Sequence, residues 1–298
     1  MNQALQVQPD NEVINWLLEA ENPGVRTRTL TELCGYSANS DIVQESRMEV
    51  AKSLDAVRNP SWMAMKGQIL VYNLSALAEA GLSRRDVDVE AVVNKLLSQP
   101  FDNGCGEVMA FRAMVMLGYG QDGRVIDRLS QMKDNQLPDG GWLCLHRLKK
   151  MDRTPRSCIK VAMHGLLLAS ELKKRGMEIN WAEGLIQYFL KRRLYYRTDH
   201  PSQLVLNLAG RRMTDVFFPS EFFHVGLPLL LEALAVLGVG NAPELEEAWV
   251  LLDKKKDAQG RIVLEGTLPT NKSYLPRERV GKPTKWGTLY AYLASKHL

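Results

Sequence analysis

The chain has 298 residues, of which 45% are hydrophobic and 24% charged, an ordinary globular composition that allows a sizeable core. Its 38 basic and 34 acidic residues leave a net charge of +4, too balanced to indicate nucleic-acid binding or an anionic membrane surface. The first ten residues are polar and lack an apolar signal segment, and no uncharged apolar run reaches the ~18 residues of a transmembrane helix. We therefore expect a cytoplasmic protein with a flexible segment at 1–10, whose four cysteines are free thiols or metal ligands.

Apolar residues recur at helical spacing from the start of the chain, where Val13, Ile14 and Leu17 share one face. Asn22-Pro23-Gly24 ends this first helix and begins the second, and Asn59-Pro60-Ser61 begins the fourth. The pattern predicts helices over residues 11–21, 23–34, 41–54 and 62–80. The fourth is rich in small and apolar residues, which predicts burial on most sides.

From Gly81 onward, charged amphipathic helices alternate with apolar helices rich in small residues. The charged helices are predicted over 87–97, 125–132, 181–194 and 243–252, and the apolar ones over 105–117, 158–172, 222–237 and 284–293. The glycines that close apolar helices, Gly35, Gly81, Gly118, Gly176 and Gly238, are unevenly spaced, as in a helical repeat with insertions in its turns.

Six apolar helices paired with six more polar ones predict an all-α fold in a single domain over residues 1–298. Both an open solenoid and a closed ring fit this pairing. A closed ring needs no capping repeats, and the final helix stays apolar up to Leu293, so we prefer the ring.

The turn from Gln136 to Trp142 reads Gln-Leu-Pro-Asp-Gly-Gly-Trp. Its proline and glycine pair stop the preceding helix, Asp139-Gly140 tolerates a positive φ, and Trp142 offers an apolar plate to the next element. The stretch from Asp257 to Ile262 holds the corresponding place in a later repeat. We expect Trp142 to hold neighbouring repeats together.

This turn, Asn-Pro-Gly-Val-Arg at Asn22–Arg26 and Lys-Pro-Thr-Lys-Trp-Gly-Thr-Leu at Lys282–Leu289 together resemble the prenyltransferase and squalene-cyclase repeat superfamily. The resemblance covers most of the chain and is closest to small single-chain prokaryotic members, whose activity is generally unassigned. It implies an α/α toroid of the α6/α6 type, in which inner helices surround a central cavity and outer helices form a sheath.

Two motifs of that superfamily are missing from this sequence. The Asp-x-Asp-Asp acid of the class II terpene cyclases has no counterpart, since the nearest run, Asp86 to Glu90, has the pattern of a helix cap. The Asp-x-Cys pair with which protein prenyltransferases hold zinc is absent too. If the chain is an enzyme, the resemblance implies a prenyltransferase- or cyclase-like transferase or lyase that works without the acid motif.

If the apolar helices line a ring, the residues at their N-terminal ends should meet at one mouth of the cavity. Cys105, Cys158 and His224 lie at such ends, and Cys144 follows the turn at Trp142, so the four form a candidate Cys₃His zinc site. No two cysteines have the compact C-x₂-C spacing, so the site depends on the ring. Buried thiols that serve as small apolar side chains are the alternative interpretation.

The same mouth supplies the other candidate site residues. His224, Lys66 and Lys285 are the candidate catalytic groups, and the candidate substrate-binding residues are Trp62, Phe111, Arg156, Phe222, Phe223 and Trp286. An ordinary core explains the aromatic residues equally, and a solvated surface explains the basic ones. The segment 195–219 lacks periodicity and is a candidate cover for the cavity.

The sequence thus favours a toroid protein that binds an apolar small molecule, such as an isoprenoid, in its central cavity and carries a zinc–thiolate centre. The second hypothesis is a non-catalytic toroid that serves as a binding scaffold for a protein or peptide partner.

Overall fold

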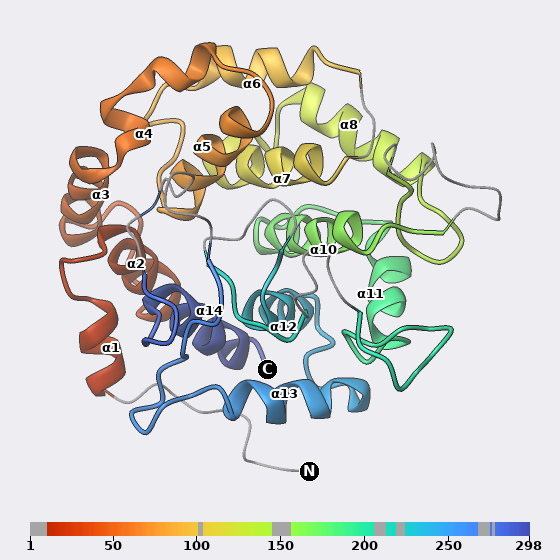
Figure 1. Ribbon diagram of the computed structural model, residues 1–298. Helices are drawn as coiled ribbons and strands as arrows, with labels where there is room; N and C mark the ends of the chain where they lie inside the picture. Colours follow the sequence, from red (N-terminus) through yellow and green to blue (C-terminus); the bar gives the residue numbers. More distant parts are fainter. Residues whose placement is uncertain are drawn as a thin grey trace.

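The computed structural model describes residues 11–100, 104–144, 156–205, 213–218, 224–267, 275 and 278–298. Within these ranges the chain is helical and has no β-strand (Figure 1). Short extended segments meet only in isolated bridges, such as Phe217 with Gly266 and Val263 with Pro283. The predicted all-α class is confirmed.

The helices follow one another along the whole described chain. The first part contains α1 (Asn11–Leu17), α2 (Pro23–Arg28) with its π-helical continuation η1 (Thr29–Leu33), α3 (Asp41–Ser53), α4 (Asp55–Arg58), the 3-10 turn η2 (Pro60–Ala64) and α5 (Gln68–Glu79). The middle contains α6 (Glu90–Leu97), α7 (Cys105–Met114) with η3 (Val115–Tyr119), α8 (Gly123–Asp134), α10 (Ile159–Lys174) and α11 (Ala182–Leu190). The last part contains α12 (Leu227–Val236), the 3-10 turn η4 (Pro243–Leu245), α13 (Glu246–Asp253) and α14 (Lys285–Lys296).

Residues with a positive φ break two of the predicted helices, and the helices expected over 11–21, 87–97 and 222–237 are shorter as well, as α1, α6 and α12. The helix expected over 62–80 is divided, because Gly67 adopts φ 65° and α5 begins only after it. The helix expected over 181–194 ends at Leu190, since Arg193 and Leu194 have left-handed φ values of 41° and 71°. The spacing of apolar residues continues through both breaks, so it could not predict them.

Six of these helices form a closed series of contacts (Figure 1). α5 packs on α7, α7 on α10, α10 on α12, and α12 on α14. α14 in turn packs on α2 and η1. Gly24 of α2 lies against α5, where an added Cβ would come within 3.1 Å of the Ala80 Cα, so the series returns to its start. The helices α3, α11 and α13 each pack on one member of this series.

The turn at Trp142 joins three helices. The fully buried Trp142 indole donates from Nε1 to the Met132 carbonyl at the end of α8, at 2.7 Å. Its ring fits against Gly165 of α10, where an added Cβ would lie 2.6 Å from Cζ3, and meets Trp181 edge-on at 5.4 Å. Trp142 therefore joins α8, α10 and the start of α11, as the sequence predicted.

The later turn at Asp257 repeats this backbone geometry. The N–H of Leu137 donates to the carbonyl of Gly141 at 2.8 Å, and the N–H of Asp257 donates to that of Arg261 at 2.8 Å. Gly140 and Gly260 sit at equivalent places, with φ values of 93° and 77°. The predicted equivalence of the two turns is confirmed.

A network of charges with a buried centre and a partly exposed edge, which we call the buried ion network, connects the helices of the closed series toward the C-terminal ends of α2, α5 and α10. Its members are Arg28, Glu32, Glu79, Arg112, Glu171, Lys174, Arg175, Glu232 and Tyr290. Glu79 accepts from Arg28 at 3.0 Å and also from Arg112 and the Tyr290 hydroxyl. Four cationic and four carboxylate side chains balance, so the network requires no external counter-ion.

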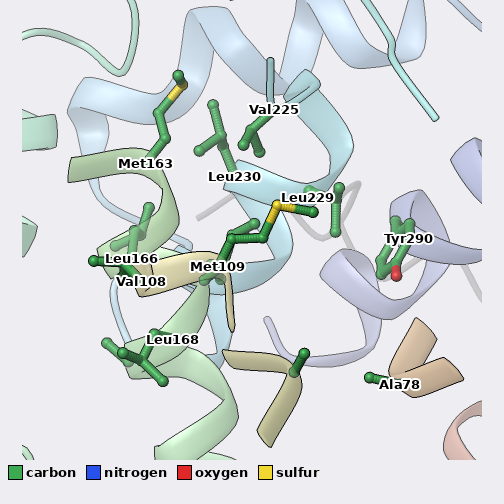
Figure 2. Packing of buried hydrophobic residues seen from close by; sticks show 14 of the residues in the cluster. Ala78, Val108, Met109, Met163, Leu166, Leu168, Val225, Leu229, Leu230 and Tyr290 are labelled. Atoms are coloured by element: carbon green, nitrogen blue, oxygen red, sulfur yellow. The ribbon is translucent and has the colours of Figure 1, made fainter. Parts of the chain in front are cut away.

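Apolar side chains occupy the space beside this network. Figure 2 shows Met109 of α7 extending toward α12, which carries Leu229 and Leu230, while Tyr290 of α14 lies across from it. No helix in the described part of the chain is long and apolar enough to cross a membrane.

Candidate functional site

The structure brings three of the four cysteines toward one end of two neighbouring helices. Cys105 is the first residue of α7, and Cys158 is the N-cap of α10, which packs on α7. The backbone N–H of Cys158 donates to the Trp142 carbonyl at 2.7 Å, which keeps the segment that carries Cys144 beside the start of α10. All three thiols are buried, whereas Cys34 is exposed.

The three thiols, here called the thiol cluster, lie close enough together for Cys144 and Cys158 to act electrostatically on Cys105. Burial first, and then the nearby Cys158 and Cys144, raise the pKa of the Cys105 thiol to about 12. Lys160 and the N–H of Gly106 oppose this rise but do not overcome it. Cys105 is therefore protonated at neutral pH and is no nucleophile by itself, because the reactive species is the thiolate.

The predicted zinc ligands do not meet at coordination distance. Among the described residues, no group of three or more His, Cys, Asp or Glu side chains is placed to hold a metal ion. The ring of His224, which lies just before α12, stacks on Phe217 with centroids 5.2 Å apart and planes 26° apart. Thiol groups are suitable zinc ligands, but the described residues are not placed at coordination distance. The zinc site therefore remains a prediction.

Two residues that the sequence did not single out border the thiol cluster. Burial raises the pKa of Tyr188 on α11, and Arg192, whose guanidinium carbon lies 4.0 Å from the centre of the Tyr188 ring, opposes that rise. Cys158 and Asp139 are close enough to act on the same hydroxyl. The i, i+4 spacing of Tyr188 and Arg192 was readable on the predicted helix, but nothing in it pointed toward the cysteines.

Arg192 is held in an unusual setting. Its Nε and Nη1 atoms are buried and have no hydrogen-bond partner in the part of the chain that the structure describes. The next two residues, Arg193 and Leu194, both have positive φ, which is uncommon outside glycine and often marks a site under functional constraint.

The start of α10 is fixed by the turn before it. The carboxylate of Asp139 accepts a hydrogen bond from the Ser157 N–H at 3.2 Å and another from the Ser157 hydroxyl. Asp139 thereby sets the position of Cys158, the next residue. The turn that marks the repeat thus also positions a thiol.

The three predicted cations lie elsewhere. Lys66 is exposed before α5, and the Arg156 side chain is exposed and lies 3.7 Å from Asp199. The Nζ of Lys285 pairs with Glu19 at 2.7 Å. The cation that acts on Cys105 is Lys160, on the first turn of α10.

The predicted aromatic lining is packed in the core where it is described. The Trp62 indole donates to the Ala56 carbonyl at 2.8 Å, Phe111 is buried in α7, and Trp286 stacks on Phe218 at 4.3 Å. Phe222 and Phe223 lie outside the described residues. So does 206–212, the middle of the candidate cover, and the cover therefore stays a prediction.

Two surface clefts lie away from the thiol cluster. One, of about 510 Å³, lies between the end of α10 and the start of α11, and Met177, Ile179, Ile186 and Leu237 form its apolar wall. The other, of about 440 Å³, lies beside the start of α14 and contains Trp16 and Lys285.

No known protein family, curated protein or solved structure matches this chain. The resemblance to the prenyltransferase and squalene-cyclase superfamily therefore rests on the sequence motifs alone.

Proposed function

We propose that the chain is an α/α toroid whose thiol cluster binds a thiophilic divalent metal ion, namely zinc. The observation that carries this proposal is the approach of three buried thiols, from the start of α7, the segment after Trp142 and the N-cap of α10. The closed series of contacts through α2, α5, α7, α10, α12 and α14 supports the toroid.

The donor set suits zinc chemically. Zn²⁺ takes thiolate and imidazole ligands in tetrahedral geometry, and Cys105, Cys144, Cys158 and His224 would supply them. Because the Cys105 pKa is about 12, the metal must displace thiol protons, so affinity should rise steeply with pH. With three protein ligands the metal would keep an open position for a substrate atom, whereas four would make it structural.

The organic ligand that we propose is apolar and of the isoprenoid class. Support comes from the sequence resemblance and from the apolar side chains between the six helices, including Met109 and Leu229 (Figure 2). If the protein is an enzyme, prenyl transfer or cyclisation without an acid motif is the reaction class to test first. Lys160 and Arg192 are then better placed than Lys66, Arg156 or Lys285 to meet an anionic group beside the thiols.

The test is the metal content of protein purified after equilibration with zinc, measured by elemental mass spectrometry. We expect one zinc per chain in the wild type, loss of that zinc in Cys158→Ser, and retention in Cys34→Ser, whose thiol is exposed. Cobalt substitution adds a direct readout, because thiolate-to-cobalt bands report the ligands. Metal-free wild type, or equal metal in the two serine variants, would refute the zinc centre.

A second candidate is the non-catalytic scaffold for a protein or peptide. It is favoured by the burial of Trp62, Phe111 and Trp286 within the core and by the buried ion network between the six helices. Titration with farnesol, followed by tryptophan fluorescence, separates the two. Saturable binding supports the ligand site, and no binding together with no zinc leaves the scaffold.

A further inference from the structure

The cleft beside the start of α14 lies where the first and last helices of the closed series meet. Its volume is about 440 Å³, within the range of small-molecule sites. Trp16 of α1 forms one wall, and six charged side chains line the rest: Glu21, Arg261, Glu278, Arg279, Lys282 and Lys285.

Two of the four cations are already neutralised and are held beside the tryptophan. Arg261 donates from Nε to Asp257 at 2.9 Å, and the Nζ of Lys285 lies 2.7 Å from Glu19. The Arg261 guanidinium carbon and the Lys285 Nζ lie 5.3 and 5.4 Å from the centre of the Trp16 ring. The indole fixes both cations in place, so little side-chain freedom is lost when a ligand reaches them.

The other two cations are unpaired. Across the described ranges, the side chains of Arg279 and Lys282 have no hydrogen-bond or ion-pair partner, and both are exposed on the cleft.

The carboxylate of Glu278, which also lines the cleft, is bound to the start of α14. It accepts from the backbone N–H groups of Lys285 at 2.5 Å and Trp286 at 3.4 Å, and from the Thr284 hydroxyl. Glu278 therefore caps the helix and does not neutralise Arg279 or Lys282. Glu21 lies 3.9 Å from Lys285, which also pairs with Glu19, so the other acid of the cleft faces Lys285 and leaves Arg279 and Lys282 without a counter-charge among the described residues.

We propose that this cleft binds a phosphate group, with Arg279 and Lys282 as its principal ligands and Lys285 and Arg261 behind them. A phosphate brings up to two charges for two unpaired cations, and a guanidinium can meet two of its oxygens at once. A carboxylate would neutralise only one. This site is separate from the thiol cluster and does not depend on the zinc proposal.

The experiment is calorimetric titration of the full chain with two probes, inorganic phosphate and phenyl phosphate. Saturable binding of inorganic phosphate would indicate a site for free phosphate. Binding of phenyl phosphate alone would indicate a site for a phosphate monoester whose organic group contacts Trp16. In either case the double variant Arg279→Ala/Lys282→Ala should weaken binding by about a hundredfold or more, because it removes both principal charge-assisted contacts to the phosphate.

The control is Arg85→Ala/Lys52→Ala, which removes the same charge from two exposed residues away from the cleft. It should bind as the wild type does. Saturable binding of neither probe at 10 mM, or an equal loss in both double variants, would overturn the proposal. Circular dichroism should show unchanged folding in both variants, because none of the four side chains makes a hydrogen bond or ion pair within the part of the chain that the structure describes. If the wild type takes up no zinc on equilibration but binds phosphate, the zinc proposal is refuted and the phosphate proposal is supported.

Discussion

At the scale of single residues, Glu79 connects the most helices. It ends α5 and accepts hydrogen bonds from Arg28 of α2, Arg112 of α7 and Tyr290 of α14. Glu79→Gln keeps the shape but leaves two buried guanidinium groups short of a counter-charge. We expect a loss of about 3 kcal/mol in the free energy of unfolding, measured with urea.

The matched control for this prediction is Glu90→Gln. Glu90 pairs with Arg124 on the surface at 3.3 Å, where water screens the charges, so its loss should leave the urea midpoint unchanged. If the two variants unfold at the same urea concentration, the buried ion network contributes nothing specific to stability.

Glu278 gives stability a pH dependence. Burial raises its pKa from the ordinary 4.5 to about 7, although the hydrogen bonds from α14 and the nearby Lys285 act in the opposite direction. The folded state therefore holds this proton more tightly than the unfolded chain does. The stabilisation is complete below pH 4.5 and is lost as the pH rises through about 7, a span that amounts to roughly 3 kcal/mol.

We expect Glu278→Gln, which cannot titrate, to lack this part of the decline between pH 4.5 and pH 7.5. Urea unfolding of both proteins at the two pH values measures it. Parallel stability curves for wild type and variant would show that Glu278 titrates at its ordinary value.

At the scale of the element, the turn before Trp142 depends on a glycine for two reasons. Gly140 has φ 93°, and an added Cβ would overlap the Gly184 carbonyl oxygen of α11. Gly140→Ala should therefore cost roughly 3 kcal/mol or more in unfolding free energy, because backbone has to move.

Gly176, at the end of α10, has φ 68° but open space around it. Gly176→Ala should cost only the left-handed strain of about 1 kcal/mol. Thermal unfolding of the two variants measures the difference. If Gly140→Ala and Gly176→Ala lose the same stability, the turn and α11 can move apart to accommodate the added Cβ at little cost.

Local signals in the sequence predicted the elements well and their breaks poorly. Turn-forming residues located the turn at Trp142 and its repeat at Asp257, and they indicated the role of Trp142, because turn chemistry depends on nearby residues. The division at Gly67 and the left-handed pair at Arg193 and Leu194 depend on tertiary contacts that no local pattern reports.

The sequence predicted only the part of the candidate site that local signals determine. Helix ends placed Cys105 and Cys158 near one another once neighbouring helices were assumed parallel. Tyr188 reaches the thiol cluster from α11 and Arg192 from the segment just after it. Glu79, Glu171 and Glu232 come from three helices and are linked through Arg112 and Lys174. Such encounters depend on which helices are neighbours, which sequence periodicity does not determine.

At the scale of the whole molecule, a toroid and an open solenoid differ in how they respond to loss of an end. In a solenoid each repeat contacts only its neighbours, so removing residues 284–298 should leave the remaining helices folded. In the proposed toroid α14 also packs on α2 and η1, and we expect the truncated chain to lose most of its helical signal in circular dichroism. A truncated monomer that keeps its helicity in proportion to its length would argue for the solenoid.

The bond between Arg28 and Tyr290 joins residues 262 positions apart, and this separation has a consequence for biosynthesis. Because α2 is synthesised long before α14, Arg28 can pair with Glu32 and Glu79 well before Tyr290 is made. Until α14 emerges, the faces of α2 and α12 that pack on it stay uncovered and are open to aggregation or to a chaperone. The nascent protein should therefore be most vulnerable just before α14 leaves the exit tunnel.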